Sequence, residues 1–434
     1  MEFRPVINRH KKHLLAACMA GFGLIATPPP ALTQQTTPTL NTKAALEKGF
    51  QPWLQNLWPD AQKAGVSRAV FDQAVANLTI DWALPDLMPL EGAKAAKRPQ
   101  QAEFRAPKAY FPPDYLERIT KFGQEKRQEH RKILTQIEQR YGVPSQILLS
   151  IWGRETSFSR AKIPYDAIRS LATLSYIGRR KELFHAELLA ALQVLEQGHV
   201  SREELKSSWA GAMGHTQFLP SKFLIHGVDF DGDGKRNIWG SLDDALATTA
   251  NYLKSKGWEK GKPWFYEVKL SLGFDCSLEG PHQSRSVAEW LKQGVKRTKG
   301  RAFPAHRLTE NGFLVLPAGL NGPTFLALKN FSVLKEYNKS DVYALFVGHL
   351  ADRIANGSSF SGKWQKVSSF SRTDIKKLQQ NLTTLGFAVG QPDGLVGTRT
   401  RATIGQYQKQ HGFALNCYPS KDLLAHVEKT AAGQ

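Results

Sequence analysis

Apolar side chains recur at the spacing of an α-helix through most of this 434-residue chain, and this periodicity restricts the possible folds more than any other feature. The stretches that predict helices are residues 41–80 (as two helices), 113–140, 144–155, 168–178, 179–198, 242–256 and 340–354. Alternating patterns, which are typical of strands, are confined to residues 265–322. We therefore predict a mainly α (α+β) fold with a small β-containing subdomain.

The first 31 residues have the layout of a secretory signal peptide. Basic residues at Arg4, Arg9, Lys11 and Lys12 precede an apolar run over 14–26, and a cleavage zone follows between Ala26 and Ala31. This pattern predicts an exported, periplasmic protein. The run Leu15-Ala16-Ala17-Cys18 leaves a second alternative, an outer-membrane lipoprotein with a lipid on Cys18. After removal of the signal peptide, Cys276 and Cys417 are the cysteines that remain, and they form either a disulfide or two buried thiols.

The chain is strongly basic, with 58 Lys and Arg against 38 Asp and Glu, a net charge of +20. Such a charge favours an anionic polymer as the partner. The basic residues are scattered rather than gathered in one arm, and no zinc-finger, RRM or KH signature occurs. An acidic membrane surface and a carboxylate-rich cell wall are therefore both better candidates for the partner than nucleic acid.

Glu155 closes the helix predicted over 144–155. Leu148, Ile151 and Trp152 precede it by seven, four and three residues, so the carboxyl shares the apolar face of that helix. Desolvation disfavours the charged form of such a carboxyl, and this is how enzymes keep a general acid protonated near neutral pH. The alternative is a structural Glu at a helix end beside Arg154.

A series of segments that includes Glu155 resembles the lytic murein transglycosylases of the B type. In order, these segments are 153–158, 171–175, 208–221, 250–253, 257–258, 330–331, 337–340 and 343–344. The resemblance covers roughly residues 45–355 and implies a lysozyme-like catalytic domain, over 41–355, that cleaves the β-1,4 bond between N-acetylmuramic acid and N-acetylglucosamine. It implies that Glu155 is the catalytic acid/base and that Ser208 is its hydrogen-bond partner.

The same resemblance implies a set of substrate-binding residues: Arg179, Arg180, Gln217, Tyr252, Tyr337 and Asn338. The residues before the Arg pair, Tyr176-Ile177-Gly178, depart from the Pro-containing pattern of the family. The roles of the two arginines therefore rest on a weaker match than the others.

Most glycosidases need two carboxyl groups, but the segments around Glu155 contain no evident second one. The nearest candidates, Asp166 and Glu182, have no supporting pattern. The resemblance implies a reaction without water, in which the sugar's own C6 hydroxyl attacks C1 and leaves a 1,6-anhydromuramyl end, with no cofactor for catalysis. Two alternatives remain: a hydrolytic muramidase, and a catalytically inactive wall-binding scaffold.

Residues 229–237 match the first nine positions of an EF-hand calcium loop. Oxygen side chains occur at Asp229, Asp231, Asp233 and Asn237, and a backbone carbonyl is expected at Lys235. Position 12 is Gly240, and the family resemblance implies that Asp243 replaces the usual Glu. We predict a structural Ca²⁺ (or Na⁺) ion in this 229–243 loop; the alternative is an acidic turn without metal.

The end of the chain predicts a separate small module. Residues 356–371 are rich in Ser and Gly, which is typical of a linker. Residues 372–430, with Asp393-Gly394-Leu395-Val396-Gly397, resemble a three-helix peptidoglycan-binding domain, although 414–419 lack the usual second Asp-Gly turn. We expect a monomer that binds peptidoglycan glycan strands, with wall-synthesis proteins as further candidate partners and no nucleic acid.

Overall fold

The computed structural model describes residues 42–90 and 106–433. The predicted signal peptide and Cys18 lie outside these described residues. Within them, no helix combines the length and the apolar character needed to cross a membrane.

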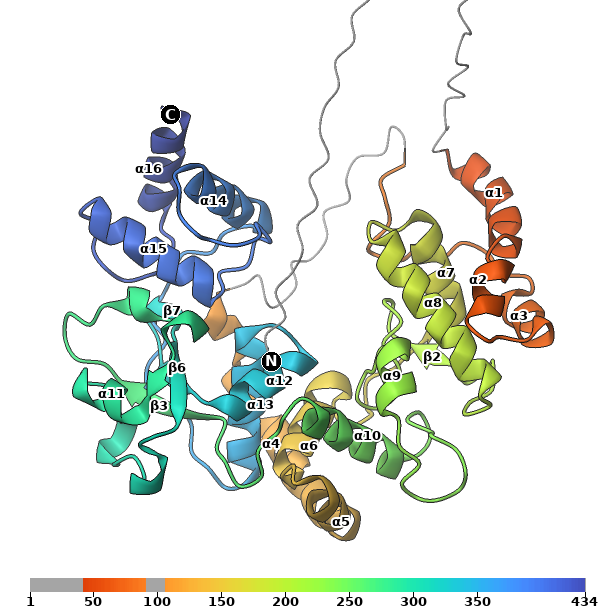
Figure 1. Cartoon of the computed structure of the whole chain (residues 1–434), viewed down its shortest axis with the longest axis horizontal. Coiled ribbons are helices and arrows are strands. Elements are labelled where there is room, and N and C mark those ends of the chain that lie inside the picture. Colours follow the sequence, from red (N-terminus) through yellow and green to blue (C-terminus); the bar gives the residue numbers. More distant parts are fainter. Residues whose placement is uncertain (1–41, 91–105, 434) are drawn as a thin grey trace, which may run out of the picture. The chain divides into compact units, whose positions relative to one another are not determined.

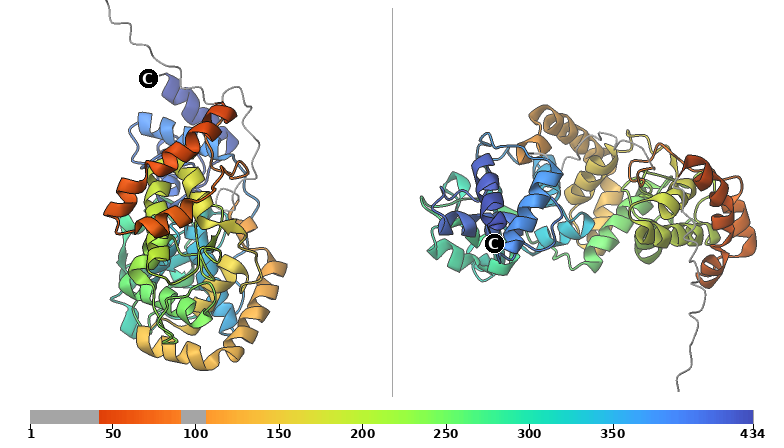
Figure 2. Two further views of the ribbon diagram at one scale, coloured as in Figure 1. Left: turned by 90° about the vertical axis from the view of Figure 1, so that its right-hand side faces the viewer. Right: turned by 90° about the horizontal axis from the view of Figure 1, so that it is seen from above.

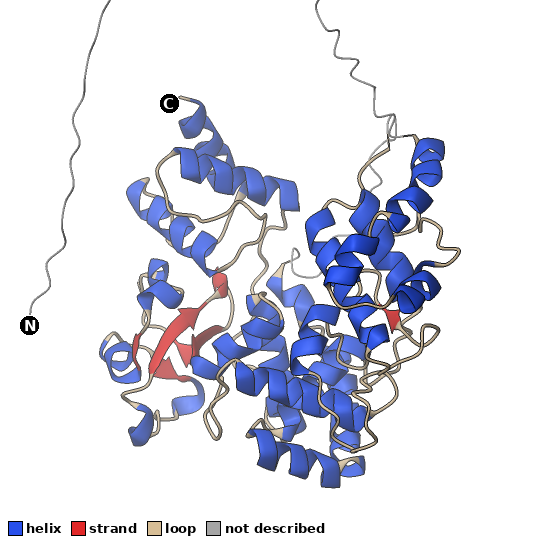
Figure 3. Cartoon of the chain, turned by 45° about the vertical axis from the view of Figure 1, so that its right-hand side comes forward, coloured by secondary structure: helices blue, strands red, loops and turns tan. Residues whose placement is uncertain are grey.

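Helices dominate the described chain, and strands gather mainly in one small sheet (Figure 3). The α-helices are α1 (Lys43–Gln55), α2 (Trp58–Lys63), α3 (Arg68–Val75), α4 (Pro113–Glu129), α5 (Arg131–Tyr141), α6 (Ser145–Thr156), α7 (Ala167–Ile177), α8 (Lys181–Glu196), α9 (Pro220–His226), α10 (Leu242–Ser255), α11 (Val287–Lys292), α12 (Lys329–Tyr337), α13 (Asp341–Ile354), α14 (Arg372–Thr384), α15 (Thr398–Gln410) and α16 (Lys421–Ala432). Short 3₁₀ turns are η2 (Pro107–Tyr110), η3 (Cys276–Leu278), η4 (Pro281–Gln283), η5 (Thr298–Gly300) and η6 (Ala305–Arg307). The predicted mainly α fold with a small sheet is confirmed.

Helix α6, which contains Glu155, lies at the centre of the helical part. It packs against α4, α5, α10 and α13, and most of its residues are buried (Figure 1). Helices α1–α3 lie beside α7 and α8, as both views of Figure 2 show. A short two-stranded ribbon pairs β1 (Tyr165–Asp166), just before α7, with β2 (Lys206–Ser207), just before the loop 208–218.

Two helix boundaries differ from those expected. The single helix predicted over 113–140 is two helices, because His130 leaves the helical conformation with φ −104° and ψ 22°. The break redirects the apolar face: α4 packs on α13, whereas α5 packs on α10. The region 42–80 similarly contains three helices rather than two, because the chain turns at Asn56–Leu57 before the Pro-containing α2.

The β-containing subdomain is an antiparallel sheet with the strand order β4-β6-β8-β3-β5. Its strands are β3 (Phe265–Lys269), β4 (Arg285–Ser286), β5 (Lys296–Arg297), β6 (Asn311–Val315) and β8 (Thr324–Ala327), with β7 (Pro317–Leu320) beside them. In its register Phe265 opposes Ala327 and Phe313 opposes the same residue from the other side. The sheet has its own apolar core, which includes Trp290 and both cysteines.

Helices α14–α16 form the predicted three-helix module, with a separate core around Leu378, Ile404 and Leu423. The module is joined covalently to the sheet subdomain, because Cys276 and Cys417 form a disulfide. This settles the alternative that the sequence left open.

The segment expected to be a linker also contacts the sheet subdomain. The backbone N–H groups of Ser361 and Gly362 donate to the Glu267 carboxylate, at 2.7 Å each. The Phe360 ring packs on Phe325, with ring centroids 4.8 Å apart. Although its composition is that of a flexible linker, the segment has specific partners in the fold.

Candidate active site

Glu155 lies in the last turn of α6, as predicted. Pro144 precedes the helix, where its missing N–H costs no hydrogen bond, and Leu148, Ile151 and Trp152 are buried along one face. Glu155 itself is partly exposed. The helix therefore places one carboxyl at the boundary between the core and the solvent.

The chain turns sharply directly after Glu155. Ser157, Phe158 and Ser159 all have positive φ, at 51°, 59° and 63°. Phe158 folds back over Gly153, where a Cβ would be 2.7 Å from the ring, so this position requires glycine. Thr156 donates to the carbonyl of His215 at 2.7 Å, which fixes the turn to the glycine-rich loop 208–218.

Tyr343, on the first turn of α13, donates its hydroxyl hydrogen to Oε1 of Glu155 at 2.6 Å. Tyr343 is 2% exposed. Burial and the negative charge of Glu155 raise the pKa of Tyr343 well above its ordinary value, so the phenol keeps its proton and remains a donor. Tyr343 belongs to one of the segments that resemble the B-type transglycosylases, but no role was predicted for it. The available signal was a polar aromatic residue on the apolar face of a predicted helix.

The loop 208–218 lies closely against the chain at Ile238. A Cβ on Gly214, which has φ 68°, would be 2.4 Å from the Ile238 carbonyl oxygen. Ser208 accepts a hydrogen bond from Ala212 N at 3.2 Å, within the loop. The Gln217 side chain donates to the Gly214 carbonyl at 3.0 Å. The predicted contact of Ser208 with Glu155 and the predicted sugar contact of Gln217 stay predictions.

Tyr337 and Tyr252 lie together, and their predicted contact with the sugar stays a prediction. Their rings are 5.7 Å apart and both pack on Phe218. Tyr337 donates to the Thr216 carbonyl at 2.5 Å, and burial together with the charge of Glu155 raises its pKa well above the ordinary value. Tyr252 is buried and donates to the Glu336 carbonyl at 2.7 Å. Asn338 follows Tyr337 and accepts from Ser340 N at 3.0 Å.

The predicted arginines lie at the junction of α7 and α8. Arg180 forms an ion pair with Asp86 at 2.8 Å, and the backbone of Arg179 donates to the Asp86 carbonyl at 2.9 Å. Both side chains are exposed and border a cleft of about 670 Å³ that also includes Met88. Glu155 is not among the residues lining this cleft. The substrate-binding roles of the two arginines stay predictions.

The two candidates for a second carboxyl have other surroundings. Asp166 accepts from Arg169 N as the N-cap of α7 and pairs with Arg202 at 2.8 Å. Glu182 is exposed in the first turn of α8. Neither has a contact with Glu155 among the hydrogen bonds and ion pairs described here.

The acidic loop gathers carboxylates as a cation site requires. Oxygens of Asp229, Asp231 and Asp244 all lie within 4.8 Å of one another. Gly232 and Gly234 have φ of 80° and 87°, and their N–H groups donate to Asp229.

Asp244 was not predicted in this cluster. The residue before it, Asp243, lies near Asp231. Burial and the charge of Asp231 raise the pKa of Asp243. Asp233 accepts from Lys235 N at 2.8 Å within the loop. Carboxylate oxygens are the hard ligands that suit Ca²⁺, and a cation would relieve the repulsion among the three carboxylates. That Asp229, Asp231, Asp233, Lys235 and Asp243 bind a cation stays a prediction.

Comparisons with known proteins agree with this geometry. The family model "Transglycosylase SLT domain" matches residues 49–352, and the model "Putative peptidoglycan binding domain" matches residues 371–425. The membrane-bound lytic murein transglycosylase B of Escherichia coli (strain K12) is 31% identical over 269 residues, which are 62% of this chain and 71% of that protein.

Solved structures give the same result. SltB3 from Pseudomonas aeruginosa, in complex with NAG-anhNAM-pentapeptide, is 38% identical with a TM-score of 0.76, over 87% of this chain and 99% of that one. The Escherichia coli lytic transglycosylase Slt35, in complex with calcium, is 27% identical with a TM-score of 0.57, over 74% and 97%. The chain therefore belongs to the SLT lytic transglycosylases, enzymes that cleave peptidoglycan, and joins their catalytic domain to a peptidoglycan-binding domain.

Proposed function

We propose that Glu155 acts first as the acid and then as the base in a cleavage of peptidoglycan that uses no water. Glu155 protonates the oxygen of the β-1,4 bond between N-acetylmuramic acid and N-acetylglucosamine, and the bond from C1 to that oxygen breaks. The C6 hydroxyl of the same muramic acid then attacks C1 and returns its proton to Glu155. The products are a free N-acetylglucosamine end and a 1,6-anhydromuramyl end.

The observation that carries this proposal is the setting of the Glu155 carboxyl. One oxygen accepts from the buried Tyr343 hydroxyl, which orients the group, while the residue stays partly exposed toward substrate. A positioned acid/base of this kind contributes roughly 10²–10⁴-fold in rate. The related SltB3 was solved in complex with an anhydromuramyl ligand, which supports the same product for this chain.

The remaining predicted site residues complete the proposal. Gln217 lies in the loop 208–218, Tyr337 is the last residue of α12 and Asn338 follows it. We assign these three residues to the groove for the glycan. The Tyr252 ring packs against the Tyr337 ring in an edge-on contact. The acidic loop binds Ca²⁺ as a structural ion, supported by the carboxylate cluster and by the calcium complex of the related Slt35. The enzyme acts in the periplasm after export.

The test is the digestion of purified peptidoglycan by the full chain, with mass spectrometry of the products. Anhydromuramyl ends are expected throughout, and reducing muramyl ends would show hydrolysis instead. Glu155→Gln should abolish turnover while leaving co-sedimentation with peptidoglycan intact. Glu182→Gln is the matched control, because it removes an exposed carboxyl. The other candidate for a second carboxyl, Asp166, is less suitable because it caps α7 and pairs with Arg202. Unchanged turnover by Glu155→Gln would refute the proposed role of this residue.

A further inference from the structure

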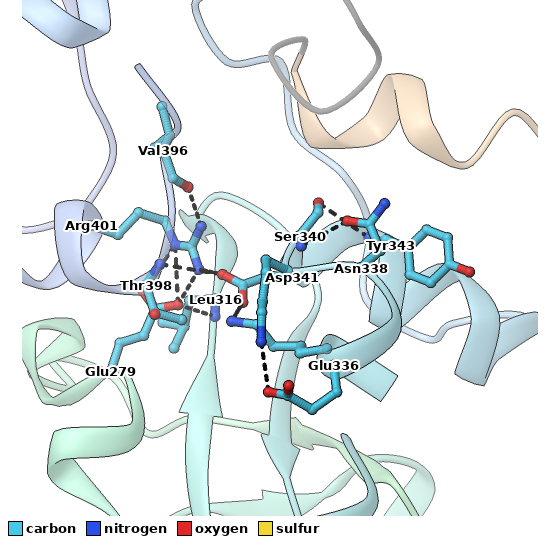
Figure 4. Close-up of polar contacts among 12 residues, drawn as sticks. Glu279, Leu316, Glu336, Asn338, Ser340, Asp341, Tyr343, Val396, Thr398 and Arg401 are labelled. Atoms are coloured by element: carbon cyan, nitrogen blue, oxygen red, sulfur yellow. Dashed lines mark hydrogen bonds and ion pairs between the residues drawn. The ribbon is translucent and has the colours of Figure 1, made fainter. Parts of the chain in front are cut away.

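The peptidoglycan-binding module contributes one fully buried arginine to the body of the enzyme. Arg401, on α15, has a side chain that is 2% exposed and donates to Glu279 at 2.5 Å and to Asp341 at 3.3 Å. It also donates to the Val396 carbonyl within the module. Figure 4 shows its guanidinium between these three acceptors.

Asp341 is the first residue of α13, and its two oxygens are divided between the body and the module. Lys335, on α12, binds Oδ1 at 2.5 Å. Arg401 and the backbone N–H of Thr398 both donate to Oδ2, at 3.3 Å each. Burial opposes the charge, but Lys335 and Arg401 hold the pKa of Asp341 below its ordinary value, so the carboxylate stays ionised.

Tyr343 lies two residues after Asp341 on the same helical turn. Its hydroxyl is the donor to Glu155, at 2.6 Å. A helical turn is rigid over two residues, so a displacement of Asp341 moves the Tyr343 backbone with it. The Tyr343 position is thus linked to Arg401 through Asp341, which Lys335 and the Thr398 N–H also hold.

We propose that Arg401 is a positioning residue for catalysis, which holds the start of α13 through Asp341 and thereby keeps the Tyr343 hydroxyl on Glu155. The proposal rests on the catalytic role of Glu155 given above. The peptidoglycan-binding module then has two roles: it binds the wall, and it completes the support of the active site. Small errors in the placement of a catalytic group cost up to about 10²-fold in rate, so this support has a measurable effect.

A soluble substrate distinguishes this proposal from the alternative that the module only binds the wall, because cleavage of a soluble substrate does not depend on wall binding. We would measure kcat and KM of the full-length enzyme on a purified, uncrosslinked tetrasaccharide-peptide fragment. Arg401→Lys shortens the side chain and replaces the planar fork, so it cannot bind both carboxylates as arginine does. We expect kcat to fall about tenfold or more while KM changes less than about twofold.

Lys409→Ala is the matched control. Lys409 lies on the same helix and pairs with Asp275 across the same interface at 2.7 Å, but its pair is exposed and does not involve α13. This variant should keep the wild-type kcat. If Arg401→Lys fails to fold, Asp341→Asn weakens the same ion pair together with that to Lys335, so its loss of kcat should be at least as large. A wild-type kcat in whichever of these two variants folds, or an equal loss in Lys409→Ala, would overturn the proposal.

A double-mutant cycle with Tyr343→Phe tests the route of the effect. If Arg401 acts through Tyr343, the double variant should be no slower than Tyr343→Phe alone. Additive losses would overturn the proposal. Glu155→Gln measured in parallel separates the two hypotheses: activity in this variant refutes the proposed function, whereas an inactive Glu155→Gln beside a fully active Arg401→Lys refutes the positioning role alone.

Discussion

His349 should make the fold lose stability in mild acid. It lies on α13, is 3% exposed, and stacks on Phe360 with ring centroids 3.8 Å apart. Burial, together with the positive charge of Arg353, lowers the pKa of His349 from its ordinary 6.5 to about 3. The folded protein therefore holds this imidazole neutral at pH values where the unfolded chain protonates it.

The sign and size of the effect follow from these two pKa values. Between 6.5 and about 3 the unfolded state binds more protons, so the stability contributed by neutral His349 is present above pH 6.5 and is lost as the pH falls. Lowering the pH from about 7.5 to about 5 should reduce the free energy of unfolding by about 2 kcal/mol through this residue. Near pH 3 the loss approaches about 4 kcal/mol.

The assay is urea unfolding of the wild type and of His349→Phe at these two pH values. Phenylalanine keeps an aromatic ring against Phe360 but does not titrate. The wild type should lose about 2 kcal/mol more than the variant between the two pH values. His306→Gln, which removes an exposed histidine, is the matched control. Parallel pH profiles for the wild type and His349→Phe would refute the reasoning.

Three further predictions concern the disulfide, the loop and the cation. Replacing both Cys276 and Cys417 by Ser should lower the free energy of unfolding by about 4–5 kcal/mol in the chain-entropy model, because the bond closes a loop over a separation of 141 residues; equal urea midpoints would contradict this. Gly214→Ala should cost about 2 kcal/mol or more and reduce turnover, because its Cβ would meet the Ile238 carbonyl at a positive φ; Gly65→Ala, with positive φ but open space, measures the backbone strain alone. Chelation should lower the melting temperature of the wild type but not of Asp229→Ala, and elemental analysis that finds no metal would reject the site.

Periodicity predicted the helices well where local residues mark both ends of the helix. The helix that contains Glu155 begins and ends close to the expected residues, because Pro144 and the left-handed turn at Ser157 are both local features. The break at His130 was not predicted. Helices α4 and α5 both pack on α6, but α4 also packs on α13 whereas α5 packs on α10. Tertiary packing of this kind leaves no local signal.

The active site was predictable only in part, for a similar reason. Glu155 stands out because a carboxyl on an apolar helical face is unusual, and that observation is local. Its hydroxyl partner Tyr343 lies 188 residues further along the chain. A contact of that sequence separation depends on the packing of α6 against α13, and single-sequence patterns give no measure of it.

The way in which the peptidoglycan-binding module is attached affects what the module contributes to the enzyme. A flexible linker would raise the local concentration of the enzyme at the wall by an amount set by linker length. Here the Cys276–Cys417 disulfide and the buried Arg401 fix the module to the sheet subdomain, and the contacts of Glu267 with residues 361–362 hold the linker to the same subdomain. We therefore expect the proposed groove and the module to engage a glycan strand in one relative geometry, because these contacts restrict the chain between them.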